Sequence, residues 1–193
     1  MKEKRKRKII VSIAISADGY IARPDGDVEW LNRPRPKGNY GMGAFFRSID
    51  TILWGRKTYE VGLKFGGSSL GVGPKIKNYV FSRRPLEPLG KNVELVREPI
   101  KDFVRQLRRE PGKDIWMMGG AGIIASFLDE GEIDEFIIHV IPVFIGEGIP
   151  LVAPRHRYVP LKLRSVRRFP DGVVRLQYRV LRRARGRLAR AKR

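Results

Sequence analysis

Cysteine is absent from this chain of 193 residues, and histidine occurs only twice. Without cysteine the protein has neither disulfide bonds nor thiolate chemistry. The chain also lacks an HExxH sequence and any cluster of histidines, so the usual zinc ligand sets are missing and no metal site is expected. His139 lies in an apolar run, which favours a packed core residue over a metal ligand.

Long hydrophobic runs are also missing. The longest nearly apolar stretch, residues 136–145, contains His139 and Pro142 and is too short to span a bilayer. Residues 9–17 follow a basic segment and superficially resemble a signal peptide, but they are few, include two serines and run into a turn-forming Asp-Gly pair. We interpret them as a first core strand and expect a cytoplasmic protein without a membrane segment.

Acidic residues are half as many as basic ones, 20 against 40, which gives a net charge of +20. The two ends carry +12 of this charge, and we divide the chain into a basic leader (1–8), one domain (9–181) and a basic tail (182–193). Basic ends can bind nucleic acid non-specifically through its phosphates. The alternative is that they are solvated segments that favour solubility.

Two common nucleotide-binding signatures are absent as well. No GxGxxG follows an early strand, which argues against a Rossmann domain, and no GxxxxGK[ST] is present, which excludes a P-loop.

Strand-like and helix-like patterns alternate along the chain. Expected helices cover residues 43–49 and 100–109, a short segment through Tyr59 and Val61, and a segment ending near Gly131. Expected strands cover residues 9–15, 51–54, 77–82, 93–96, 115–118, 133–141, 161–169 and 173–181. This order predicts an α/β domain with a mostly parallel sheet and an antiparallel C-terminal edge, where a hairpin turns at Asp171-Gly172.

The stretch IWMMGGAGIIASFL, residues 115–128, is central to the functional prediction. A buried strand runs through glycines into a helix, and such a helix start presents backbone N–H groups to which a phosphate can bind. Glycine allows the ligand to approach the backbone closely. An ordinary tight turn between a strand and a helix would give the same pattern, so the signal needs support from other segments.

Two other strand ends supply that support. Cations and hydroxyl groups follow the strands at residues 51–54 and 77–82, namely Arg56, Lys57, Thr58, Ser82, Arg83 and Arg84. Ligands of parallel α/β sheets bind at the carboxyl ends of the strands, and arginine and hydroxyl groups suit phosphate oxygens. NADPH would use a pyrophosphate site and a separate cationic site for its 2′-phosphate. The alternative is that these are ordinary surface cations.

Four acids, Asp18, Asp25, Asp27 and Glu29, fall close together near the start of the domain. Asp18 and Asp25 each precede glycine, as turn-forming residues do. Asp27 precedes an apolar run and is either a helix cap or a partly buried acid that donates a proton to a substrate nitrogen.

Five segments in this order resemble the dihydrofolate reductase superfamily, and specifically a stand-alone branch similar to the reductase domain of riboflavin biosynthesis. The segments are SADGYIARPDGDVEWL, ILWGRKTYE, YVFSRR, IWMMGGAGIIASFL and IDEFIIHVIPVFIGEGIPL. The resemblance covers about residues 9–181. It implies a three-layer fold with helices on both faces of the sheet, NADPH as the hydride donor, and a homodimer to which the apolar strand at 136–145 contributes.

The resemblance also implies the roles of individual residues. Ala14, Ile21 and Ala22 would line the nicotinamide end. The pyrophosphate and the nearby ribose and phosphate would be held by Gly55, Arg56, Lys57, Thr58, Gly119, Gly120, Ala121, Gly122 and Ile123, with a cis bond between Gly119 and Gly120. Ser82, Arg83 and Arg84 would flank the adenosine and its 2′-phosphate. Asp18, Asp27, Trp30 and Phe45 would bind the substrate.

The catalytic acid and the substrate remain open at this point. Asp27 is the first candidate for the proton donor, Glu29 is a second, and a reaction that needs no acid is the third alternative. The substrate is expected to be a heterocycle with a C=N or C=O bond. A pterin-like substrate would pair with Asp27, whereas a ribosylaminopyrimidine phosphate would need nearby cations such as Arg33, Arg35 and Lys37. The alternatives are a nucleic-acid-binding protein and a nucleotide-binding relative without catalysis.

Overall fold

The computed structural model describes residues 6–64, 75–86, 90 and 92–181. Most of the basic leader and all of the basic tail, for which nucleic-acid contact and solvation are the two interpretations, lie outside the described residues.

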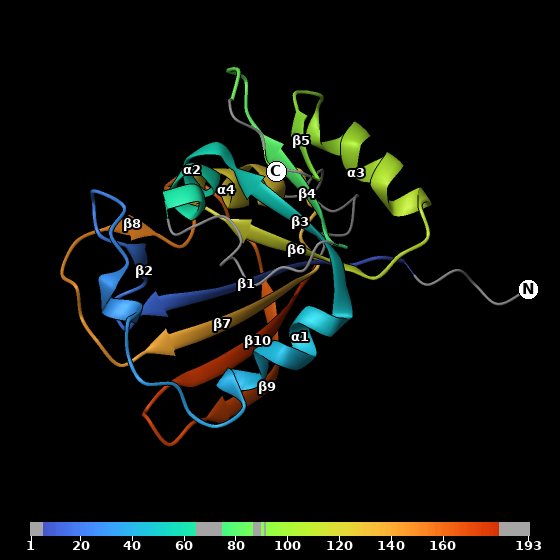
Figure 1. Cartoon of the computed structure of the whole chain (residues 1–193). Coiled ribbons are helices and arrows are strands. Elements are labelled where there is room, and N and C mark those ends of the chain that lie inside the picture. The colour runs from blue at the N-terminus through green and yellow to red at the C-terminus, as the bar shows by residue number, and fades with distance from the viewer. Residues whose placement is uncertain (1–5, 65–74, 87–89, 91, 182–193) are drawn as a thin grey trace, which may run out of the picture.

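One eight-stranded sheet forms the centre of the molecule, in the order β5-β4-β3-β6-β1-β7-β10-β9 (Figure 1). The strands from β5 to β7 run parallel, and β10 is antiparallel to both of its neighbours, β7 and β9. Their bounds are β1 (Ile9–Ser16), β3 (Ile49–Gly55), β4 (Lys77–Phe81), β5 (Val93–Val96), β6 (Asp114–Gly119), β7 (Glu135–Ile141), β9 (Leu161–Arg168) and β10 (Val174–Val180). The predicted mostly parallel sheet with an antiparallel edge is confirmed.

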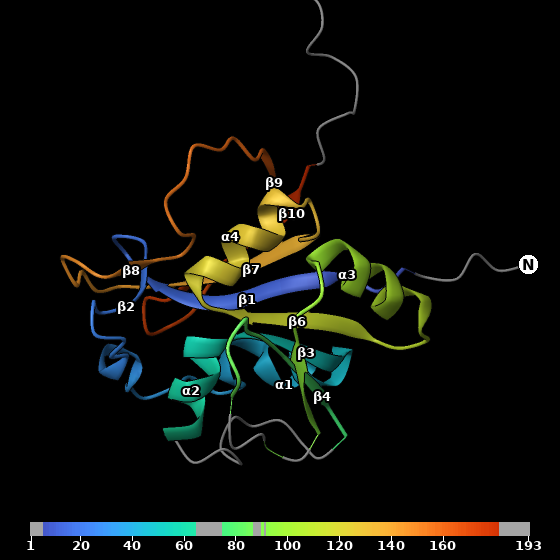
Figure 2. The ribbon, with the colours of Figure 1, turned by 90° about the horizontal axis from the view of Figure 1, so that it is seen from above.

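Helices cover both faces of this sheet, as Figure 2 shows. On one face lie α1 (Met42–Ser48) and α2 (Arg56–Lys64), and on the other lie α3 (Ile100–Arg109) and α4 (Ala121–Asp129). Two apolar clusters fill the spaces between the layers, one built around Phe103 and Phe127 and the other around Trp54 and Trp116. Because each helix buries one apolar stripe against the sheet, the helical spacing in the sequence was a sound guide to their positions.

The antiparallel edge departs from this layered packing. All eight residues of β9 are exposed. The predicted hairpin turns where Gly172, at a φ of +84°, donates its N–H to the carbonyl of Phe169 at 3.1 Å. By contrast, β7 lies between β1 and β10, and so the run at 136–145 does not form an exposed edge, although Phe144 beyond the strand is 81% exposed. The expected contribution of this run to an interface remains a prediction, and β9 is the strand whose residues are all exposed at this edge.

Four short elements complete the fold. A small two-stranded sheet pairs β2 (Tyr20–Ala22) with β8 (Ile149–Pro150). Two 3₁₀ segments, η1 (Glu29–Leu31) and η2 (Asn39–Gly41), lie on the connection between β2 and α1. Figure 1 shows this connection passing across the end of β7 on its way to α1.

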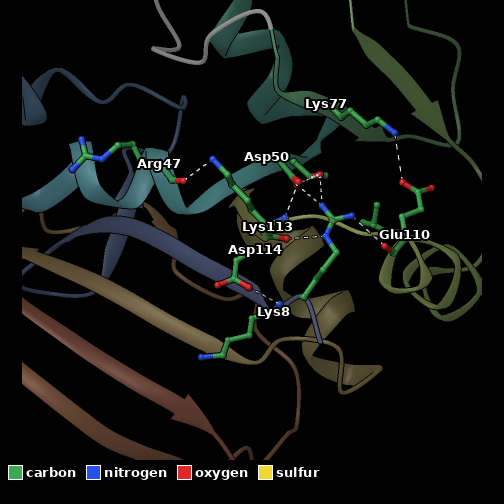
Figure 3. A network of polar contacts seen from close by, with 10 residues as sticks. Lys8, Arg47, Asp50, Lys77, Glu110, Lys113 and Asp114 are labelled. Atoms are coloured by element: carbon green, nitrogen blue, oxygen red, sulfur yellow. Dashed lines mark hydrogen bonds and ion pairs between the residues drawn. The ribbon is translucent and has the colours of Figure 1, made fainter. Parts of the chain in front are cut away.

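The opposite, amino-terminal edge of the sheet is closed by a network of charged side chains (Figure 3). Arg7 is 4% exposed, and its guanidinium donates to the carbonyls of Lys113 and Leu107, at 2.8 and 3.2 Å. The same guanidinium donates to the hydroxyl of Thr51 at 2.7 Å and to the Asp50 carboxylate. Arg7 was assigned to the basic leader, but its side chain is thus part of the packed domain.

Candidate active site at the carboxyl edge of the sheet

The three strand ends singled out in the sequence are neighbours in the sheet. Gly55 at the end of β3 pairs with Phe81 at the end of β4, and Trp54 pairs with Gly119 at the end of β6. Since the three strands are parallel, the segments that follow them emerge at one edge. The structure therefore brings together the predicted groups at residues 55–58, 82–84 and 119–123.

Two glycines give this edge a close backbone approach. A Cβ on Gly120 would lie 2.9 Å from the Thr58 hydroxyl oxygen, and one on Gly55 would lie 3.2 Å from Ile123 and 3.3 Å from the carbonyl oxygen of Gly119. The bond between Gly119 and Gly120 is cis, as the resemblance implied, and Gly119 has a φ of +111°. We name this surface, formed by Gly55, Thr58, Gly119, Gly120 and Ile123, the glycine cradle.

The start of α4 adjoins the glycine cradle and is open. Its N-cap residue, Gly120, makes no side-chain cap hydrogen bond. Gly122 in the first turn is exposed, and a Cβ added there would meet no atom within 4 Å. A helix start carries partial positive charge and N–H groups without partners inside the helix. Together with the backbone that glycine leaves accessible, this arrangement fits the pyrophosphate of a dinucleotide.

The predicted cations surround the cradle in different ways. Arg56 at the start of α2 forms an ion pair with Glu60 one turn later, at 2.5 Å, whereas Lys57 is exposed. Arg83 and Arg84 are exposed beyond the end of β4. The Ser82 hydroxyl bonds to the backbone of Arg84 in both directions, at 2.8 and 3.1 Å, and so shapes the turn that carries the two arginines. Arg56 is therefore partly neutralised, and three cations remain exposed on this side.

The residues predicted to line the nicotinamide end reach the cradle unequally. The Ile21 side chain points to it, because its Cδ1 lies 3.9 Å from the Cβ position of Gly120. Ala14 is partly exposed on β1, in register with His139 of β7. Ala22 is buried, and its carbonyl is so close to Gly148 that a Cβ there would lie 2.2 Å from it. Ala22 thus fixes β2 against β8, and its predicted contact with a cofactor remains a prediction.

The two candidate aspartates near the substrate end both have partners in the chain. The Asp18 carboxylate accepts hydrogen bonds from the backbone N–H groups of Ile145 and Gly146, at 3.2 and 2.8 Å. The Ser16 hydroxyl, followed by these backbone groups, lowers the pKa of Asp18 below its ordinary value of 3.8. The Asp27 carboxylate accepts the N–H of Glu29 at 3.2 Å and lies 3.6 Å from Arg23.

These contacts give both aspartates a structural role. Asp18 ties the β1–β2 turn to the segment before β8. Asp27, at 38% exposure, accepts the first N–H of η1, but the N-cap position itself is held by Val28. Their roles toward a substrate, including proton donation by Asp27, remain predictions.

Trp30 and Phe45 differ in how fully their side chains are engaged by contacts within the domain. Phe45 packs edge-on against Trp116, with ring centroids 5.4 Å apart, and so belongs largely to the core under α1. The indole N–H of Trp30 is buried and has no hydrogen-bond partner among the described residues. Buried donors without partners are rare in folded proteins, and the predicted contact of Trp30 with a substrate remains a prediction.

Sequence reasoning missed one polar cluster near this edge. Tyr40 of η2 donates a hydrogen bond to the Asp171 carboxylate at 2.5 Å, and Arg33 donates to the Asp171 carbonyl at 2.8 Å. His139 and Arg175 lie directly beneath, at paired positions of β7 and β10. The prediction that His139 is a packed core residue is confirmed by its 7% exposure. No spacing rule could have joined Tyr40 to Asp171, which are 131 residues apart.

Two further observations concern metals and membranes. The described residues hold no group of three or more His, Asp or Glu side chains arranged to bind a metal ion. Within the same residues, no helix has the length and apolar character needed to cross a membrane.

The fold is that of a dihydrofolate reductase-like domain, with the glycine cradle at the carboxyl edge of its sheet. The match to the RibD C-terminal domain covers residues 7–175, and this chain belongs to that family. The resemblance stated from the sequence is thereby confirmed.

Individual relatives agree with this assignment. The chain is 36% identical over 168 residues to the uncharacterized protein YwjB of Bacillus subtilis, covering 87% of this chain and 95% of YwjB. It is 28% identical, with a TM-score of 0.80, to the structure of a putative riboflavin biosynthesis protein from Shewanella, covering 91% and 99% of the two chains. A dihydrofolate reductase from Enterococcus faecalis complexed with NADP(H) shares the fold, with a TM-score of 0.63 at 14% identity and coverage of 90% and 96%.

Proposed function

We propose that this protein is an NADPH-dependent reductase that transfers hydride to a C=N or C=O bond of a heterocyclic substrate. The observation that carries the proposal is the glycine cradle beside the open start of α4, with exposed cations on the neighbouring strand ends. Membership of the RibD C-terminal domain family supports a reductase, and supports a ribosylaminopyrimidine-type substrate over a pterin-like one.

Three kinds of group in the chain would bind NADPH: backbone N–H groups, a hydroxyl group and arginine side chains. Gly55, Gly120 and the first turn of α4 would hold the pyrophosphate, with Thr58 as a hydroxyl donor. Arg83 and Arg84 would bind the 2′-phosphate, a role for which the arginine fork is suited. When bound, NADPH supplies the hydride from its nicotinamide ring.

The substrate would lie beyond Ala14 and Ile21, under η1. There the unpartnered indole N–H of Trp30 would orient it, and Asp18 would act indirectly by holding the segment around Gly146. We retain Asp27 as the first candidate proton donor. Its exposure means that it would deliver a proton in exchange with solvent, so a water molecule alone is the competing source.

Gly120→Ala provides the most direct test, because the added Cβ would lie 2.9 Å from the Thr58 hydroxyl oxygen and occupy the cradle. We expect purified wild-type protein to bind NADPH in a fluorescence titration, NADH much more weakly, and Gly120→Ala to lose at least about tenfold in NADPH affinity. Gly43→Ala is the matched control, since its nearest neighbour would be the end of the Arg47 side chain at 3.7 Å. If wild type binds neither nucleotide, the reductase proposal fails.

A second variant tests whether the protein distinguishes NADPH from NADH through the 2′-phosphate. Arg83→Ala/Arg84→Ala is expected to weaken NADPH binding and leave NADH binding unchanged, because only NADPH carries the 2′-phosphate. Equal losses for both nucleotides would instead place these arginines elsewhere on the cofactor or in the fold.

We also propose that the protein forms a homodimer through β9. On this edge strand Leu161, Leu163 and Val166 are 42, 49 and 53% exposed. Exposed edge strands that carry apolar side chains favour association. An apolar cavity of about 350 Å³, lined in part by Leu161, Phe136 and Ile138, adjoins the strand. Leu163→Lys/Val166→Lys is expected to give monomers in light scattering, and Lys162→Glu on the same strand is the control.

The competing function is non-specific nucleic-acid binding through the basic ends, which the charge of +20 favours. A truncated chain of residues 7–181 retains the buried Arg7 and removes +10 of the net charge of +20. We expect this chain to keep NADPH affinity and to lose salt-sensitive DNA binding. Loss of NADPH affinity would instead assign the ends to the cofactor site. The cytoplasmic location expected from the sequence is part of the same proposal.

A further inference from the structure

A second unusual feature of the molecule is the backbone of residues 38–41, which we name the strap. All four residues have positive φ angles: Gly38 at 85°, Asn39 at 42°, Tyr40 at 56° and Gly41 at 87°. Side chains other than glycine adopt this region at a cost, roughly 1–2 kcal/mol per residue. Such a conformation persists only where surrounding contacts impose it.

The contacts that impose it come from the hairpin of β9 and β10. Tyr40 donates its hydroxyl to the Asp171 carboxylate at 2.5 Å, and its carbonyl accepts from Arg175 at 3.4 Å. Its ring packs edge-on against Phe169, with centroids 5.0 Å apart. Arg33, at the start of the same connection, forms an ion pair with Asp171 at 3.6 Å. The strap is therefore held closed by contacts to Phe169 and Asp171 at the hairpin turn and to Arg175 of β10.

The strap covers a histidine that has no countercharge. His139 is 7% exposed, its Nε2 has no hydrogen-bond partner among the described residues, and its ring centroid lies 5.9 Å from that of Tyr40. On β10 its paired neighbour is Arg175, whose Nε is likewise buried without a partner in the described part of the chain. On β1 its neighbour is Ala14, which has no charge.

The wider surroundings are also unfavourable to a protonated histidine. After burial, the charge of Arg167 on β9 lowers the pKa of Arg175. The charges of Arg33 and Arg35 oppose the rise in the pKa of Tyr40 that burial causes. The charged groups around the strap are therefore mainly cationic. Asp171 is the acid in contact with the strap, and its carboxylate is already engaged by Tyr40 and Arg33. A proton on His139 would therefore be buried beside a cation, and this state is costly.

We propose that the strap is a pH-operated clasp, closed over neutral His139 and opened when His139 takes up a proton. Opening lets the imidazolium reach water and moves it away from Arg175. The connection that contains the strap joins Trp30 to α1, so opening would disturb the substrate end of the site. That consequence rests on the proposed function, whereas the clasp itself does not.

The direction of the pH effect follows from proton linkage. Burial, and next the Arg175 guanidinium, lower the pKa of His139 in the closed state below its ordinary value of 6.5, although hydrogen bonding to the Tyr40 and Ile13 backbone opposes the shift. The open state regains the ordinary pKa and binds protons more readily. Closure is therefore fully favoured above pH 6.5 and is lost as the pH falls through the lower value.

The bond that holds the clasp does not titrate in this range. Hydrogen bonding from Tyr40 keeps the pKa of Asp171 below its ordinary value of 3.8. Burial, and next the Asp171 carboxylate, raise the pKa of Tyr40 above 10.0. Between pH 5.5 and 7.5, His139 is therefore the group in the cluster whose protonation can change.

Hydrogen exchange of the full-length protein without added nucleotide tests the clasp. The reporters are the N–H groups of Asn39 and Gly41, which bond to the carbonyls of Pro36 and Gly38 at 2.9 Å. After correction for intrinsic exchange rates, their protection is expected to fall by up to about tenfold from pH 7.5 to 5.5, the limit set by an ordinary histidine pKa in the open state.

Variants assign the effect to His139. In His139→Gln the protection should not change over this range, whereas His156→Gln on an exposed segment should behave as wild type. If His139→Gln does not fold, Arg175→Gln serves instead and should weaken the pH dependence, because it removes the neighbouring cation. Tyr40→Phe should lower protection at every pH and retain the slope. A flat wild-type profile, or an unchanged slope in His139→Gln, would overturn the proposal. Because no nucleotide is present, either outcome is independent of the reductase assignment.

Discussion

Arg7→Met is expected to destabilise the fold, whereas Lys8→Met is expected to leave it nearly unchanged. The Arg7 guanidinium donates to the Asp50 carboxylate, to the Thr51 hydroxyl and to the carbonyls of Leu107 and Lys113. Methionine can replace the apolar stem of the side chain, but it leaves all four acceptors without this donor. The acceptors come from β3, from the end of α3 and from the residue before β6, so Arg7 joins three elements to the first strand.

The magnitude follows from burial. Removing one partner of a buried ion pair costs about 3–5 kcal/mol. Here Asp50 is 33% exposed and keeps hydrogen bonds from the Lys113 N–H at 2.7 Å and the Thr51 hydroxyl at 2.8 Å. The expected loss is therefore smaller, about 2–4 kcal/mol in the free energy of unfolding. For a domain of this size it corresponds to a melting temperature lower by about 4–16 °C.

Urea unfolding of the full-length protein measures this loss. Lys8 is 47% exposed and pairs with Glu135 at 2.6 Å, so Lys8→Met should cost less than about 1 kcal/mol. Asp50→Asn combined with Arg7→Met should cost less than the sum of the two single changes, because the residues share one network. If Arg7→Met and Lys8→Met lie within about 0.5 kcal/mol of each other, the argument that Arg7 closes the amino-terminal edge is refuted.

Two further predictions also concern the stability of the fold. Gly112→Ala would place a Cβ 2.6 Å from the Asp50 carboxylate and 2.9 Å from Arg7, and should cost about 1–3 kcal/mol; an unchanged urea midpoint would mean that the network can move aside. The Asp18 carboxylate, whose pKa is lowered chiefly by the Ser16 hydroxyl, stabilises the fold above its ordinary pKa of 3.8, and this contribution is lost as the pH falls through the lower folded value. Asp18→Asn should therefore melt earlier than wild type at neutral pH, with a difference that shrinks in acid.

Much of the fold was predictable because its signals are local. The alternating or continuous apolar runs of β1 and β6 reflect central strands, and the spacing of Phe103, Val104 and Leu107 places one face of α3 in the core. The start of β7 was predicted two residues early, at residue 133. Ile133 is buried, but the strand begins at Glu135, since burial alone does not mark the beginning of a hydrogen-bonded strand.

The candidate site also has one part that the sequence predicted and another that it did not. The glycine cradle could be located because glycines at the ends of parallel strands leave a strong local pattern and the sheet brings those ends together. The strap could not be located. Asn39 and Tyr40 are not residues that mark a left-handed backbone as glycine does, and the contacts that hold them come from Asp171 and Arg175, far along the chain. Arg7 was missed because a basic run at a terminus usually indicates solvated side chains.

The charged network and the proposed binding site lie at opposite ends of the same strands, and their independence can be tested. Asp50 and Gly55 lie near the two ends of β3, five residues apart, which corresponds to roughly 16 Å along an extended strand. At that separation, changes without shared partners should be additive. The double variant Arg7→Met/Gly120→Ala should therefore lose the sum of the two unfolding free energies and bind NADPH as Gly120→Ala alone does. A double variant whose affinity falls well below that of Gly120→Ala would mean that the charged network at the amino edge shapes the cradle through the sheet.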